Sequence, residues 1–123
     1  MDKVLGKGTI ERQRIIVVDE EHELLSPLTV QLEHAGFSVS KARRGAEAMK
    51  LIKEAGADLV IINPTLTDMN GFKLAVQIKE NWNVPFVFLS DKLSEEFREA
   101  ALAVGALQYL SKSSRPDENV TQI

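Results

Sequence analysis

The feature that most constrains the fold of this chain is the alternation of short apolar runs with longer segments of helical pattern. The first run, 15–18, is Ile-Ile-Val-Val, a stretch of β-branched residues typical of a strand buried on both faces of a sheet. Leucines then recur at helical spacing until Gly36, where a helix is expected to end. Further strands are expected at 37–42, 59–62, 85–89 and 108–110, and further helices from Gly45, Gly71 and Ser94.

This order of elements predicts an α/β fold with a parallel sheet. Short connections in a repeated β–α pattern favour right-handed crossovers between neighbouring parallel strands. A chain of 123 residues is enough for one domain with one core. Residues 1–13 are mostly polar and are expected to form a flexible N-terminal arm, and 14–123 are expected to form the folded domain.

Composition excludes several classes of function. The net charge is −3 and no basic stripe is visible, so we expect no nucleic-acid binding by this domain. The absence of cysteine excludes disulfides and thiolate metal sites and fits a reducing cytoplasm, where we expect the protein to reside. The longest apolar runs are about five residues, far short of a membrane span, so no membrane partner is expected. No glycine-rich phosphate loop is present, which argues against an NTPase.

Polar residues follow the predicted strands at positions where function is expected. In parallel sheets of this kind, functional groups gather at the carboxyl ends of the strands. Asp19 and Glu20 follow the first strand, and Asn63, Ser90 and Lys112 follow or end the third, fourth and fifth. Adjacent acids can hold Mg²⁺, although they are also favoured at a helix N-terminus. A cation, a hydroxyl and an ammonium group together form an environment suited to a phosphate.

Five motifs in the same order as these elements resemble the receiver domains of two-component response regulators. The matching pieces are IIVVDE at 15–20, GAEA at 45–48, DLVII with MNG at 58–62 and 69–71, VPFVFLS at 84–90, and VGALQYLSK at 104–112. The resemblance covers 14–115. It implies a flavodoxin-like, doubly wound sheet of five parallel strands in the order 2-1-3-4-5. Few apolar residues follow Lys112, so the family's fifth helix is expected to be short or truncated.

The resemblance also implies a role for each residue at the sheet edge. Asp19 and Glu20, with the backbone carbonyl of Thr65, would bind Mg²⁺. Asn63 would occupy the position of the aspartate that accepts a phosphoryl group from a histidine kinase. Ser90 and Lys112 would hold the phosphoryl oxygens, and the aromatic ring of Tyr109 would turn inward when the hydroxyl moves.

An amide at position 63 changes the chemistry that this site is expected to perform. Phosphoryl transfer to a side chain needs a nucleophilic oxygen, which a neutral carboxamide does not supply. The site also carries one negative charge fewer, so we expect weakly bound Mg²⁺ or no cofactor. Asp68 and Asp91, the nearest other acids, are expected to face solvent.

Other departures from the family lie in the two neighbouring loops. Pro64 follows the acceptor position directly, and Thr67 and Ser113 stand where the family usually has proline. We expect the Lys112–Ser113 bond to be trans, because a cis bond before a residue other than proline costs about 3 kcal/mol. A natural domain that no longer needs phosphotransfer and an engineered Asp→Asn variant both stay open as origins of Asn63.

A partner surface is expected on the face that the family's fourth helix and fifth strand form. Leu102 and Ala103 fall on the predicted helix, and Leu107 stands where the family often has an acidic residue. An exposed apolar patch of this kind tends to mark an interface. The alternative is that the fifth helix or the tail covers Leu107. A homodimer through this face is possible.

The function expected from the sequence is a signalling receiver module that is not an enzyme, cannot be phosphorylated, and acts through contact with a protein partner such as a sensor kinase or an output domain. One alternative is a conventional phosphoacceptor receiver of a histidine kinase phosphorelay, captured as an Asp→Asn variant. Another alternative, of a different class, is a small-ligand binding module that uses the same crevice.

Overall fold

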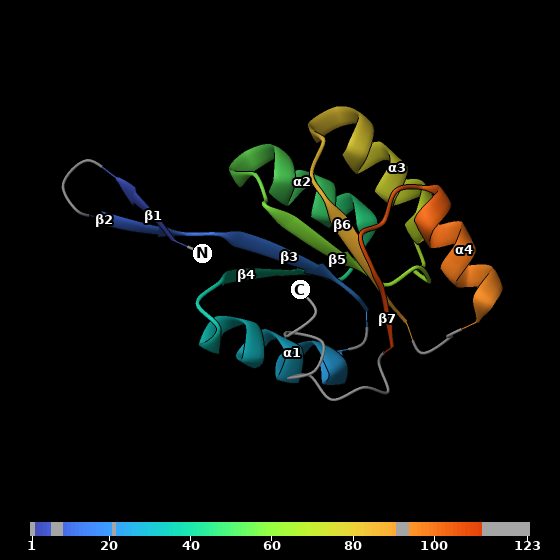
Figure 1. Cartoon of the computed structure of the whole chain (residues 1–123), viewed down its shortest axis with the longest axis horizontal. Helices are drawn as coiled ribbons and strands as arrows, with labels where there is room; N and C mark the ends of the chain where they lie inside the picture. The colour runs from blue at the N-terminus through green and yellow to red at the C-terminus, as the bar shows by residue number, and fades with distance from the viewer. Residues whose placement is uncertain (1, 6–8, 21, 91–93, 112–123) are drawn as a thin grey trace.

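A five-stranded parallel sheet forms the centre of the structure, a computed structural model that describes residues 2–5, 9–20, 22–90 and 94–111 (Figure 1). The strands are β3 (Arg14–Val18), β4 (Ser38–Ala42), β5 (Leu59–Ile62), β6 (Phe86–Ser90) and β7 (Tyr109–Ser111). Their spatial order is β4-β3-β5-β6-β7, and every neighbouring pair is parallel. This is the predicted order 2-1-3-4-5, so the expected fold is confirmed.

Four helices in the described part of the chain cover the two faces of the sheet (Figure 1). They are α1 (His22–His34), α2 (Gly45–Ala55), α3 (Gly71–Trp82) and α4 (Glu95–Ala103). The side chains of α1 pack into one core cluster, whereas those of α2, α3 and α4 pack into the other. None of these helices has the length and apolar character that crossing a membrane requires.

Successive residues of β3 point into different cores, which explains the uninterrupted apolar run at 15–18. Ile15 and Val17 join the cluster beneath α1, and Ile16 and Val18 join the cluster beneath α2 and α3. All four side chains are at most 1% exposed. Because side chains alternate between the two faces of a strand, only a strand covered on both sides needs an apolar residue at every position.

The N-terminal segment, expected as a flexible arm, contains a hairpin that the sequence pattern did not predict. β1 (Asp2–Leu5) pairs with β2 (Thr9–Arg12) in an antiparallel two-stranded sheet. The hairpin projects beyond the central sheet from the start of β3 (Figure 1). The three residues between the strands read Gly-Lys-Gly, a composition that favours short hairpin connections. The polar character of 1–13 hid this local signal.

Helix α3 extends two residues further than the sequence pattern indicated, which predicted a loop at 81–83. The loop predicted at 81–83 begins only at Asn83, which has a left-handed backbone (φ 53°) and donates its N–H to the carbonyl of Lys79 at 3.0 Å. Asparagine is one of the few residues that tolerate this conformation, and it ends helices in this way. Trp82 is therefore a helical residue packed against the core, not a loop residue.

The expected fifth helix and the Lys112–Ser113 bond lie outside the described residues, as do Lys112 itself and Asp91. The described chain ends with β7, whose pairing with β6 aligns Ser111 with Ser90.

Candidate functional site

The carboxyl ends of β3, β5 and β6 meet at one edge of the sheet and bring three polar side chains into the interior. Asp19, Asn63 and Ser90 are 3%, 7% and 2% exposed. Backbone hydrogen bonds continue past the strand ends, from Asn63 N–H to the carbonyl of Val18 and from Asp19 N–H to that of Ala42, each at 2.9 Å. These three residues therefore lie at the same edge of the sheet, as the strand pattern predicted.

Both polar ends of the Asn63 amide are hydrogen-bonded. Its Nδ2 group donates to Oδ1 of Asp19 at 3.2 Å, in a buried contact. Its Oδ1 atom accepts the backbone N–H of Thr65 at 2.9 Å, a local turn that asparagine favours. A rotation of the amide would exchange its donor and acceptor and break both contacts. The side chain is therefore held facing Asp19.

The Glu20 side chain binds the loop between β5 and α3. One carboxylate oxygen accepts the N–H of Thr67 at 2.5 Å, and the other accepts its hydroxyl at 2.8 Å. Arg43 approaches the backbone carbonyl of Glu20 at 3.4 Å. Hydrogen bonds to an ionised carboxylate are stronger than those between neutral groups. Both carboxylate oxygens of Glu20 are therefore hydrogen-bonded to a single residue of the neighbouring loop.

The acid pair in this arrangement does not fit a Mg²⁺ ion. Magnesium requires oxygen ligands at about 2.0–2.1 Å in a near-octahedral set. One carboxylate oxygen of Asp19 and both of Glu20 instead accept hydrogen bonds from N–H or O–H groups. No three acidic, histidine or cysteine side chains of the described chain are grouped to hold a metal ion. The N–H group of Thr65, whose carbonyl was the expected third ligand, donates to Oδ1 of Asn63.

Asp68 caps the start of α2 from the β5–α3 loop. Its two carboxylate oxygens accept the N–H groups of Gly45 and Ala46, each at 3.0 Å. Arg44, the first residue before the helix, supplies no side-chain cap of its own. The side chain is exposed, as expected, but it is not simply solvated. Because a helix start carries free N–H groups, a carboxylate there is stabilising.

These contacts lower the pKa of Asp68. Desolvation acts in the opposite direction, since it raises the pKa, but it is outweighed by the hydrogen bonds from Ala46 and Gly45 and by the positive charge of Arg44. The charged form is therefore favoured, as a capping role requires.

Two glycines allow the β5–α3 loop to pack this closely. A Cβ at Gly71 would lie 2.4 Å from Cα of Pro64 and 2.7 Å from the carbonyl oxygen of Asn63. A Cβ at Gly45 would lie 2.5 Å from the sulfur of Met69. Gly71 also donates its N–H to the carbonyl of Pro64 at 2.9 Å. The glycine that closes the motif after Asn63 is therefore needed for close backbone approach.

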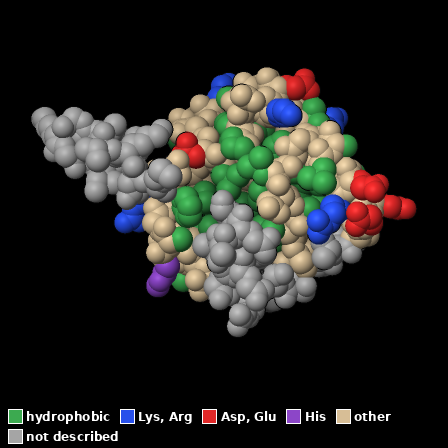
Figure 2. All heavy atoms as spheres, in the orientation of Figure 1, with side chains coloured by type: hydrophobic (Ala, Val, Ile, Leu, Met, Phe, Trp, Pro, Cys, Tyr) green, Lys and Arg blue, Asp and Glu red, His purple; other side chains and the backbone are tan. Residues whose placement is uncertain are grey.

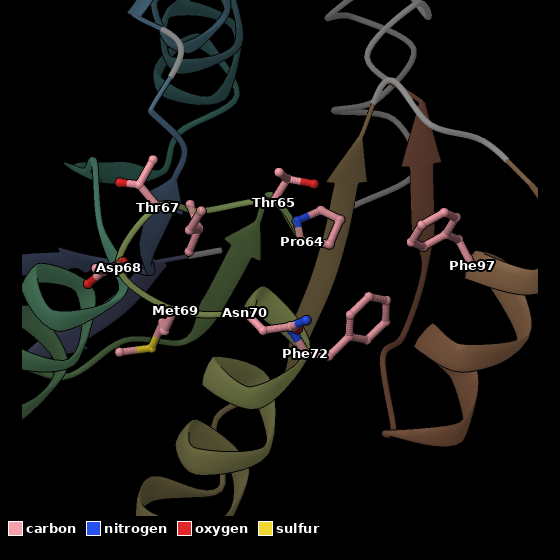
Figure 3. A pocket seen from close by; sticks show the side chains of 9 residues that line it. Pro64, Thr65, Thr67, Asp68, Met69, Asn70, Phe72 and Phe97 are labelled. Atoms are coloured by element: carbon pink, nitrogen blue, oxygen red, sulfur yellow. The ribbon is translucent and has the colours of Figure 1, made fainter.

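The same loop forms one wall of an open pocket of about 400 Å³ (Figure 3). Phe72 from α3 and Phe97 from α4 form the aromatic part of its lining, with ring centroids 6.4 Å apart. Phe72 continues to Phe88 at 4.7 Å, and Phe88 to Tyr109 at 6.2 Å. The sequence analysis did not predict this pocket. Phe72 and Phe97 each lie in the first turn of a helix, and this position was visible in the sequence.

The switch residues suggested by the family resemblance are only partly described. Tyr109 is buried, at 6% exposure, beside Phe88, and Ser90 is buried at the end of β6. Lys112, expected to hold phosphoryl oxygens, lies outside the described residues. The structure brings Asp19, Asn63 and Ser90 to one edge, and it pairs the carboxylate of Glu20 with Thr67.

The residues of the expected partner surface are exposed. Leu102 is 53% exposed and Leu107 61%, and Ala103 is also exposed. Leu107 additionally lines a small cleft of about 220 Å³ whose apolar lining includes Phe37 and Leu59. Figure 2 shows hydrophobic side chains gathered near the middle of the visible face, and acidic side chains at the side where α4 lies.

Comparison with known proteins gives a consistent family match. The family model described as response regulator receiver domain matches residues 15–123. The regulatory protein VanRc of Enterococcus gallinarum is 32% identical over 111 residues, which are 90% of this chain and 48% of that protein. The DNA-binding response regulator MtrA of Mycobacterium tuberculosis is 32% identical over 112 residues, which are 91% of this chain and 49% of MtrA. This chain spans about half the length of these curated relatives.

Solved structures share the fold at lower identity. A CheY-like receiver domain protein from Methanospirillum hungatei superposes with a TM-score of 0.82 at 24% identity, covering 91% of this chain and 90% of that one. The chemotaxis protein CheY4 of Vibrio cholerae superposes with a TM-score of 0.84 at 23% identity, covering 91% and 96%.

Proposed function

This chain belongs to the response regulator receiver family, and we propose that it is a signalling receiver module which acts through protein–protein contacts and does not accept a phosphoryl group. Its partner is a sensor kinase or an output domain. The observation that carries the proposal is the state of Asn63. This residue follows β5 at the carboxyl edge of the sheet, where its amide is tied to Asp19 and to the Thr65 N–H.

The chemistry of the amide supports this function. A phosphoryl acceptor needs an oxygen with an available lone pair and negative charge. The carboxamide oxygen of Asn63 is neutral and already accepts a hydrogen bond. Asp68 cannot readily replace it, because its carboxylate caps α2. The crevice therefore lacks a free carboxylate where the family would place its acceptor.

Contacts at the α4–β7 face are the proposed means of action. Leu102 and Leu107 are large apolar side chains exposed to more than half of their full extent. Exposed apolar side chains that gather on one face favour association with another protein. The buried position of Tyr109 would let this surface adopt a fixed form that a partner recognises.

The experiment compares the native chain with Asn63→Asp after incubation with Mg²⁺ and acetyl phosphate, and measures the intact mass of each. We expect neither protein to gain a phosphoryl group efficiently, because the loops around position 63 also differ from the family. Rapid labelling of Asn63→Asp alone would favour a phosphorelay receiver captured as an Asp→Asn variant. An adduct on the native chain would overturn the proposal.

A further inference from the structure

The contact between Glu20 and Thr67 joins two loops at the functional edge. Glu20 follows β3, and Thr67 lies 47 residues later in the β5–α3 loop. One residue supplies both donors, its N–H at 2.5 Å and its hydroxyl at 2.8 Å, and they reach different oxygens of one carboxylate. Two convergent donors restrict both the position and the rotation of that carboxylate.

A second contact joins the same two chain segments in the interior. The Nδ2 group of Asn63 donates to Oδ1 of Asp19 at 3.2 Å, and both side chains are more than nine-tenths buried. A buried carboxylate needs a compensating donor or cation, since desolvation of an unpaired charge is costly. An amide N–H₂ group provides that donor at position 63. An acid at the same position would place a second negative charge there.

The loop that carries Thr67 is also held from its other side. Asp68 binds the first two N–H groups of α2, and Met69 packs against Gly45. Three consecutive residues are thus attached to neighbouring elements. Thr67 is therefore placed by the surrounding structure to reach Glu20, and a cation is not needed to draw the loops together.

We propose that the hydrogen bonds Asn63–Asp19 and Glu20–Thr67, here called the carboxylate clamp, take the place of a divalent cation, and that Thr67 is the residue which excludes Mg²⁺ from Glu20. The inference rests on the proposed function in placing Asn63 at the receiver's acceptor position. It adds a different claim, because it assigns loss of cation binding to Thr67 as well as to position 63.

The Glu20–Thr67 part of the carboxylate clamp depends on which residue stands at position 67. A proline has neither a backbone N–H nor a hydroxyl, so it could make neither of the two bonds to Glu20. A cation competing for Glu20 in this chain must displace both donors of Thr67, and one that also binds Oδ1 of Asp19 must displace the amide of Asn63. Because Mg²⁺ sheds its own water reluctantly, it gains little from ligands that are already engaged.

The test is isothermal titration calorimetry with Mn²⁺ and with Mg²⁺ on four proteins: the native chain, Asn63→Asp, Thr67→Pro and the double variant. We expect no binding heat from the native chain up to about 10 mM cation. We expect Asn63→Asp to bind weakly, and the double variant to bind about tenfold more tightly than Asn63→Asp. Circular dichroism of each protein checks that it is folded.

A second pair of variants tests the inference even if the proline variant does not fold. Asn63→Asp/Thr67→Ala removes the hydroxyl donor and keeps the backbone N–H donor, and we expect it to bind Mn²⁺ more tightly than Asn63→Asp but less tightly than the proline double variant. Asn63→Asp/Thr65→Ala is the matched control, because Thr65 donates to position 63 through its backbone N–H. We expect it to bind as Asn63→Asp does.

Two results would overturn the inference. One is submillimolar binding of Mn²⁺ by the native chain, and the other is equal affinity of Asn63→Asp with and without the changes at position 67. Neither result depends on phosphoryl transfer. A native chain that binds no cation but gains a phosphoryl group would refute the proposed function alone, and a native chain that binds Mn²⁺ but gains no phosphoryl group would refute the clamp alone.

Discussion

Asn63 and Asp19, 44 residues apart in the chain, meet where β5 and β3 end, with the amide nitrogen of one 3.2 Å from the carboxylate oxygen of the other. The contact is buried, and the amide oxygen is simultaneously held by the N–H of Thr65. The amide thus supplies a hydrogen-bond donor to a buried carboxylate oxygen.

Replacing this amide with an acid should therefore destabilise the domain. In Asn63→Asp the donor to Asp19 is lost and two carboxylates face each other, so we expect the free energy of unfolding at pH 7 to fall by about 1–3 kcal/mol in buffer that contains a chelator. Urea denaturation measures it. Asn63→Ala, which removes the donor without adding charge, is the control and should lose less. A variant Asn63→Asp as stable as the native chain would contradict the role assigned to this contact.

The close approach of Gly71 to the turn after β5 makes a second prediction. A methyl group at this position would meet backbone atoms of Pro64 and Asn63, which cannot move without shifting the site. We expect Gly71→Ala to lower the free energy of unfolding by about 1–3 kcal/mol, although alanine is the better helix former. Gly45→Ala is the matched comparison, because it meets only the flexible Met69 side chain. Equal effects of the two substitutions, measured by thermal unfolding, would argue against backbone crowding at Gly71.

The capping of α2 by Asp68 should make stability depend on pH. The folded-state pKa lies below the ordinary value of 3.8, so the stabilising effect is complete above that value and is lost as pH falls through the folded-state pKa. We expect the difference in unfolding free energy between the native chain and Asp68→Asn to be largest near neutral pH and to shrink below about pH 4.

Urea denaturation between pH 7 and pH 3 tests this dependence on Asp68. Glu54→Gln, at an exposed position near the end of α2, controls for the loss of one negative charge. A difference between the native chain and Asp68→Asn that stays constant across this range would show that the carboxylate charge is not what caps the helix.

The exposed Leu107, in the segment between α4 and β7, gives a prediction about association. Leu107→Asp replaces a large exposed apolar side chain with a charge, so we expect weaker self-association or partner binding while the free energy of unfolding changes little. Light scattering at increasing protein concentration reports the average mass. Val30→Asp, 48% exposed on α1, is the control. If both variants and the native chain have the same average mass at every concentration, self-association through this surface is excluded.

The strands and helices of the central domain could be predicted because the pattern of apolar residues in the sequence follows the pattern of buried positions. The run at 15–18 is apolar throughout since β3 faces two cores, and Ser94 caps α4 by accepting the N–H of Phe97 at 3.2 Å, as its position before two acids indicated. The hairpin at the N-terminus was missed because a two-stranded ribbon needs no buried face, so its residues lack the apolar pattern by which strands were recognised.

The site was predicted in part for a related reason. Which residues end the strands follows from the strand pattern, and so Asp19, Asn63 and Ser90 could be placed together. The direction of the Glu20 side chain could not, because its partner Thr67 belongs to a loop whose path depends on Gly71, on Asp68 and on the start of α2. The sequence showed an unusual threonine, but only the packed loops show what it binds.

The attachment of three consecutive loop residues, Thr67 to Glu20, Asp68 to α2 and Met69 to Gly45, means that position 63 cannot be judged alone. An acid placed there would leave the bonds of residues 67–69 intact, so a cation-binding site would need coordinated changes. The effect of any one of them depends on whether the others have already been made.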